Sequence, residues 1–132
     1  MSDANADDIV EVESPVAFED TLERVTSAIQ GAGLTIFARI DHAANARDVG
    51  MTMPPATVLI YGNAKGGTPV MLGAPLAALD LPLRVLVRER EDKRAAIAFH
   101  PAAPMLRRAG APEELAVRLA PAQRLLVAAV AP

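Results

Sequence analysis

The chain has 132 residues, a formal net charge of -3 and no cysteine. The length fits a single domain with a buried core, and the lack of cysteine excludes disulfides, thiolate metal sites and a cysteine nucleophile. Aromatic residues make up only 3% of the chain, so aliphatic side chains must build the core. The acidic balance and the scarcity of aromatic rings both argue against nucleic acid as a partner.

The charges are distributed unevenly along the chain. Residues 1–23 carry eight acidic and no basic side chains, whereas residues 84–124 carry nine basic and five acidic ones. We expect the acidic segment to lie near the basic one, within the chain or across a dimer. The alternative is a basic face that binds nucleic acid, which would require the arginines to share one face without acidic neighbours.

Neither end of the chain carries a targeting or membrane signal. Residues 1–8 form a polar, acidic tail that lacks the apolar stretch of a secretory signal. The longest apolar run, residues 125–131, is too short to span a bilayer. We therefore expect one domain over residues 9–131, in the cytoplasm and without a membrane partner.

The first half of the chain predicts two strands and two helices. Residues 9–13 alternate and predict a short strand, and residues 34–40 predict a second one. Between them lies a helix whose apolar stripe is Phe18, Leu22, Val25 and Ile29. The inward side chains of the second strand would be Leu34, Ile36, Ala38 and Ile40. Asp41 is placed to cap a short helix over residues 42–49.

The second half of the chain supplies the rest of the predicted sheet. Strands are expected over residues 57–61, 83–89 and 95–99, and the last two are joined by a charged hairpin loop over residues 91–94. Proline at positions 101 and 104 should end the sheet, because proline cannot donate to a strand ladder.

A final helix is expected over residues 112–130, with a kink or restart at Pro121. The order strand, helix, four strands, helix predicts an α+β fold: a largely antiparallel sheet with two long helices packed on one face. The uncovered face would be mixed, carrying Thr35, Phe37, Arg39, Arg84, Leu86 and Arg88. A mixed face suits solvent or a dimer interface, whereas an apolar face would need a partner.

A glycine-rich stretch over residues 62–68 follows the third strand. We expect an exposed loop there, in which Thr68 caps a helical turn with Pro69 in its first position. Lys65 precedes the glycines, an order that differs from a nucleotide-binding P-loop. Two interpretations remain: a weaker anion site, or a plain turn whose glycines adopt positive φ.

Polar residues in and near this stretch form the predicted ligand-binding set. Asp80 stands alone in an apolar run, where it either accepts backbone N–H bonds in a turn or faces the glycine-rich stretch across a pocket. The set is Asn63, Lys65, Thr68, Asp80 and Arg84. Met51, Met53 and Met71 are candidates for the edge of an apolar cleft.

An acid–base site is the alternative interpretation. Asp41 and His42 are the only adjacent acid and imidazole, and Tyr61 adds a third group for such chemistry. Neighbours in sequence usually point apart, however, and helix capping would already occupy Asp41. The two histidines show no ligand spacing, so we predict no metal site and no cofactor.

Several segments are together similar to one known family. They are Tyr-Gly-Asn-Ala-Lys at residues 61–65, Asp-Leu-Pro-Leu at residues 80–83, and residues 40–44 and 50–55. On these residues the chain resembles the family named domain of unknown function 302, over about residues 9–130. The resemblance implies the α+β fold described above and a homodimer, and it implies no reaction. Tyr61 and Ala64 depart from the family pattern, where Phe and Pro are more usual.

These observations predict a non-catalytic module that acts as a homodimer. Its partner would be a small ligand, with an anion as the candidate, or another protein. The alternative prediction is an enzyme of unknown reaction that uses Asp41, His42 and Tyr61.

Overall fold

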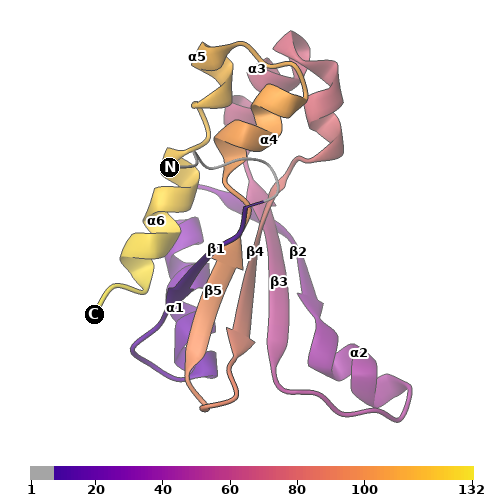
Figure 1. Ribbon diagram of the computed structural model, residues 1–132, viewed down its shortest axis with the longest axis vertical. Helices are drawn as coiled ribbons and strands as arrows, with labels where there is room; N and C mark the ends of the chain where they lie inside the picture. Colours follow the sequence, from indigo (N-terminus) through magenta and orange to yellow (C-terminus); the bar gives the residue numbers. More distant parts are fainter. Residues whose placement is uncertain (1–7) are drawn as a thin grey trace.

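The computed structural model describes residues 8–132, which form one five-stranded sheet flanked by helices (Figure 1). The strand order is β1-β5-β4-β3-β2, and every neighbouring pair is antiparallel. The predicted tail over residues 1–8 lies outside the described residues except for Asp8. None of the helices described is long and apolar enough to cross a bilayer.

The α+β class and the predicted order of strands and long helices are confirmed. The strands are β1 (Val10–Glu13), β2 (Thr35–Asp41), β3 (Ala56–Gly62), β4 (Leu83–Glu89) and β5 (Ala95–Phe99). The helices are α1 (Phe18–Gly31), α2 (His42–Asp48), α3 (Ala64–Gly73), the 3-10 helix η1 (Pro75–Leu79), α4 (Ala102–Arg108), α5 (Glu113–Ala116) and α6 (Pro121–Ala129).

Helices α1 and α6 pack side by side and contribute to the core with one face of the sheet (Figure 1). The predicted apolar stripe of α1 is buried, as are Leu126 and Val130 at the end of the chain. The sheet meets these helices with the buried side chains of Leu59, Val85 and Ile97. Each such residue stabilises the fold by about 1.5–3 kcal/mol relative to exposure.

A second helical layer sits at one end of the sheet. Helices α3, η1, α4 and α5 form it (Figure 1). Its separate apolar cluster is Val70, Ala74, Ala77, Leu106, Ala111 and Ala116. Helix α4 was not predicted. Pro104 falls within its first turn, where the missing N–H removes no helical hydrogen bond.

The predicted final helix is divided in two. Helix α5 ends at Ala116, and α6 restarts with Pro121 in its first turn. The restart follows from the proline ring, which has no N–H for an internal helical bond but fits the first turn.

A β-bulge interrupts β2. Ile36 lies opposite Tyr61, but Ala38, two residues later, lies opposite Ile60, the immediate neighbour of Tyr61. The extra residue, Phe37, shifts the pairing by one position, which exchanges the two faces for the rest of the strand. The prediction of an uninterrupted alternation over the second strand is therefore wrong.

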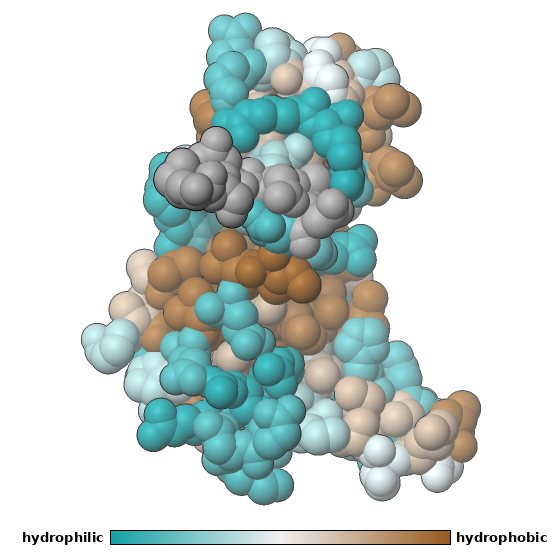
Figure 2. Space-filling model, in the orientation of Figure 1, coloured by the Kyte–Doolittle hydropathy of each residue, from teal (hydrophilic) through white to brown (hydrophobic). Residues whose placement is uncertain are grey.

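The bulge changes the uncovered face of the sheet. Arg39, predicted on that face, instead lies opposite Leu59 on the helix-covered side. The open face, as we call it, has an apolar middle formed by Ala38, Ile40, Val58, Ile60, Leu86 and Ala98. Figure 2 shows this apolar region in brown across the middle of the molecule. The prediction of a mixed face is therefore wrong for its middle.

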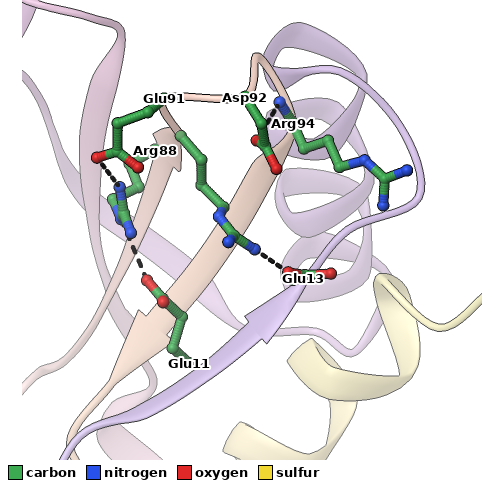
Figure 3. A network of polar contacts seen from close by, with 7 residues as sticks. Glu11, Glu13, Arg88, Glu91, Asp92 and Arg94 are labelled. Carbon is green, nitrogen blue, oxygen red and sulfur yellow. Dashed lines mark hydrogen bonds and ion pairs between the residues drawn. The ribbon is translucent and has the colours of Figure 1, made fainter.

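The acidic strand β1 lies beside basic residues of β4 and of the turn that follows it (Figure 3). Glu11 accepts a hydrogen bond from Arg88 at 3.1 Å, and Glu13 pairs with Arg90. For Glu11 and Glu13, these contacts confirm the expectation that acidic residues of the first segment lie near the basic one within the chain. Exposed pairs of this kind contribute about 0–1 kcal/mol each, so they orient β1 more than they stabilise it.

Candidate functional site

A cavity of about 480 Å³ opens between the second helical layer, the end of β3 and helix α6. Its volume lies in the range of small-molecule sites, about 300–1,000 Å³. The wall is mostly apolar and includes Leu34, Phe37, Met71, Leu81, Leu119 and Leu125. These residues come from separate parts of the chain, so only the tertiary fold assembles the cavity.

Helix α3 forms one wall of this cavity. The Asn63 side chain caps it, because its Oδ1 accepts the Gly66 N–H at 2.7 Å and the helix begins at Ala64. Two predictions are therefore wrong: residues 62–68 are not an exposed loop, and Thr68 does not cap a helix that starts at Pro69. Asparagine is a better N-cap than threonine, so the helix starts at the earlier site.

Two glycines in the first turns of α3 keep the cavity open. A Cβ added at Gly66 would lie 3.2 Å from the capping oxygen of Asn63 and 3.6 Å from Cδ2 of Leu119. A Cβ at Gly67 would meet nothing closer than Cε of Met71 at 3.9 Å. Neither glycine has positive φ, contrary to the plain-turn interpretation. Their role here is to leave space.

The polar part of the lining is small. Asn63 and Thr68 contribute an amide and a hydroxyl, and Arg118 is the single charged residue in the described lining. Arg118 is exposed and makes no ion pair with another described residue. The cavity thus combines an apolar wall with one cation that forms no ion pair within the described part of the chain.

The five predicted ligand-binding residues do not meet in one place. Asn63 and Thr68 line the large cavity, whereas Asp80 and Arg84 line a second cavity of about 310 Å³. Lys65 is exposed and lines neither of these two cavities. The glycine-rich stretch and Asp80 therefore line different cavities.

The most buried polar residue of the second cavity has a structural role. Gln123 is 6% exposed, and its Oε1 accepts the Ala102 N–H at 2.8 Å while its Nε2 donates to the His100 carbonyl at 2.7 Å. The amide thereby ties α6 to the start of α4. The Asp80 side chain makes no hydrogen bond with a described residue, so the predicted backbone bonds are not formed.

The Asp41–His42 pair lies at the start of α2. Asp41 Oδ1 accepts the Ala44 N–H at 2.9 Å, which confirms its predicted role as a helix cap. Asp41 pairs in register with Thr57, four positions from Tyr61 on β3, a separation of about 13 Å along the strand.

Tyr61 is fully buried in the core. Its hydroxyl donates to the Ala122 carbonyl at 2.9 Å, and burial raises the pKa of the phenol above its usual range. Neither Tyr61 nor Asp41 nor His42 lines either cavity. The arrangement does not support the alternative acid–base interpretation.

Sequence reasoning missed the C-terminal wall of the cavity, including Arg118. The apolar spacing of Leu115, Leu119 and Ala122 could have indicated a buried helical face here, and these residues do pack against the two apolar clusters. The local sequence does not indicate which strand this face would pack beside. Of the three methionines proposed for a cleft, Met71 lines the cavity, whereas Met51 and Met53 are exposed elsewhere. No group of three or more potential metal ligands occurs among the described residues.

Comparison with known proteins identifies relatives of this chain. The family model described as Domain of unknown function DUF302 matches residues 10–131. The fold is similar to the crystal structure of an uncharacterized conserved DUF302 protein from Bacillus stearothermophilus, with a TM-score of 0.79 and 15% identity over 92% of this chain and 94% of that one. The structural likeness concerns the fold alone.

Two curated proteins share a shorter segment. The Fluoride-specific ion channel FluC 1 of Brucella suis biovar 1 (strain 1330) is 38% identical over 81 residues, which are 61% of this chain and 32% of that protein. The FluC 1 protein of Brucella abortus biovar 1 (strain 9-941) has the same identity over 30% of its length. The match therefore spans about a third of these relatives.

Proposed function

The chain belongs to the DUF302 family, and from that premise and the geometry of its cavity we propose that it is a non-catalytic module that binds a small ligand and acts as a homodimer. The observation that carries the proposal is the 480 Å³ cavity with its apolar wall. Segments that carry the family resemblance line it, including residues 62–64 and 81–83.

The partial match to longer relatives supports the idea of a module. The segment shared with the two Brucella proteins makes up only 30–32% of their length, and those proteins are named fluoride-specific ion channels. We infer that in such longer chains the segment acts as an attached binding unit. The channel activity itself is a property of the relatives.

The homodimer is proposed from the open face of the sheet. Its apolar middle lacks a cover within the described residues, and three arginines and three glutamates lie around it: Arg84, Arg88, Arg90, Glu11, Glu13 and Glu91. A symmetric dimer brings the same surface together from both copies, so a face with balanced charge meets its copy without net repulsion. A second copy of the chain is therefore the proposed occupant.

Ligand binding can be tested with N-phenyl-1-naphthylamine, a neutral apolar dye whose fluorescence rises in apolar surroundings. We expect saturable binding with one dye per chain. The variant Gly67→Leu should weaken the affinity by about tenfold or more, since the new side chain occupies the cavity.

The matched control is Gly31→Leu, because Gly31 is also helical, is outside the cavity lining and has nothing within 4 Å of an added Cβ. It should bind the dye as the wild type does. Replacing a helical glycine by leucine favours the helix by up to about 1 kcal/mol, so lost binding in Gly67→Leu would not reflect unfolding. A wild type without saturable binding, or equal affinity in both variants, would contradict the proposal.

A further inference from the structure

We infer that the ligand of the large cavity is an apolar carboxylate, a molecule with a hydrocarbon body and one acidic head group. The inference rests on the proposed function, because it assigns a chemical class to the ligand of the same cavity. It follows from three properties of the cavity: its volume, its apolar wall, and the charge and hydrogen-bonding groups of its polar lining.

The volume and the wall define the body of the ligand. At about 30 Å³ for each water-sized group, 480 Å³ accommodates roughly 16 such groups. The side chains of Leu34, Phe37, Met71 and Leu125 offer no hydrogen bonds to that body. A sugar or other polyhydroxyl ligand would leave its hydroxyls unpaired here, at a cost of about 1–3 kcal/mol each. A hydrocarbon chain instead gains about 0.8 kcal/mol for each buried CH₂.

The polar groups define the head group. The Oδ1 atom of Asn63 already accepts the Gly66 N–H, which occupies one of its two lone pairs, whereas the NH₂ group bonds to no described residue and offers two donors to a ligand. Thr68 offers a hydroxyl, and Arg118 offers a guanidinium with no ion-pair partner among the described residues.

No aspartate or glutamate occurs in the described lining of the cavity. A cationic head group would therefore meet only the positive charge of Arg118. A carboxylate suits this set of groups, because a guanidinium binds it with two parallel hydrogen bonds and both amide and hydroxyl can donate to it. The charge of the site thus selects an acid over an amine or an alcohol.

The test compares ligands with the same hydrocarbon chain and different head groups. Dodecanoate, dodecan-1-ol and dodecyltrimethylammonium are used to displace the bound dye from the full chain, the two ionic compounds below their micelle concentrations and the alcohol below its solubility limit. Dodecanoate should displace the dye at a concentration about tenfold below that required for dodecan-1-ol, and the ammonium compound should be the weakest.

The variant Arg118→Gln should remove the preference for dodecanoate while leaving displacement by dodecan-1-ol unchanged. The matched control is Arg124→Gln, since Arg124 is an exposed arginine of α6 that does not line the cavity. It should keep the preference of the wild type.

Each contrary result would overturn a different part of the proposal. If dodecan-1-ol or the ammonium compound displaces the dye as well as dodecanoate does, the ligand class is overturned and the binding module survives. If Arg118→Gln keeps the full preference for dodecanoate, the assignment of the head-group site is overturned. A wild type that binds no dye overturns the proposed function itself.

Discussion

Tyr61 joins the sheet to helix α6 beside the wall of the cavity. The residue is fully buried, and its hydroxyl donates to the carbonyl of Ala122, whose residue lines the cavity. A phenylalanine, the more usual residue at this position of the family, would fill the same space without that bond. The hydroxyl therefore adds a polar connection between β3 and α6.

The variant Tyr61→Phe should lower the free energy of unfolding by about 1 kcal/mol, the net contribution of one hydrogen bond. Because burial raises the pKa of Tyr61 above the ordinary value of 10.0, the unfolded state ionises first. The wild type should lose stability as the pH rises above that value, and the variant should lack this contribution. Urea unfolding at several pH values measures both. Tyr61 is the only tyrosine, so equal pH slopes in the two proteins would contradict the interpretation.

The residue at which helix α3 begins determines which side chains form one wall of the cavity. A start at Pro69 would have left residues 62–68 as an exposed loop, whereas the Asn63 cap places them in and before the first turns of a helix. The N-terminal turn then brings Gly66 and Gly67 to the cavity wall. One side-chain hydrogen bond thus helps to determine which residues face the cavity.

The two possible caps can be distinguished by substitution. Asn63→Ala should lower the free energy of unfolding by about 1 kcal/mol through loss of the cap. Thr68→Ala should change it by no more than about 0.5 kcal/mol, because the exposed Thr68 side chain caps nothing. Thermal or urea unfolding of the two variants provides the comparison. A larger loss in Thr68→Ala would indicate that the helix starts at the later site.

The molecule as a whole covers only one face of its sheet. Helices α1 and α6 bury one side, while the open face keeps six apolar side chains in its middle. Antiparallel sheets often leave one face to solvent, but that face is then usually polar. The apolar middle and the balanced charges around it are the basis for the proposed homodimer.

Light scattering over a range of protein concentrations should give a molar mass of two chains, each of 13.8 kDa. Leu86→Glu should shift the protein to the single-chain mass, because it places an acidic group on the open face. Leu76→Glu is the control, since Leu76 is 71% exposed on η1, away from the open face, and it should leave the dimer intact. Circular dichroism confirms that each variant is folded. A wild type of single-chain mass, or dissociation only in the control, would contradict the proposed interface.

Local features of this fold follow from the sequence by itself. The α1 stripe, the Asp41 cap and the charged hairpin between β4 and β5 involve residues a few positions apart, where helical spacing, capping and turn preferences decide the outcome. The family resemblance, confirmed by the family model, agreed with the order of elements predicted along the chain, whereas the order of the strands within the sheet was not predicted. Part of the site was also predictable, because Asn63 and Thr68 do line the cavity.

Tertiary structure alone decided the rest. The bulge at Phe37 depends on how β2 pairs with β3, and it turned a predicted mixed face into one with an apolar middle. The cavity joins segments around residues 32–37, 62–71, 81–83 and 118–125, so its contents, including Arg118, depend on contacts between residues far apart in the chain. Sequence periodicity describes neighbours along the chain, and it carries no information on which distant segments meet.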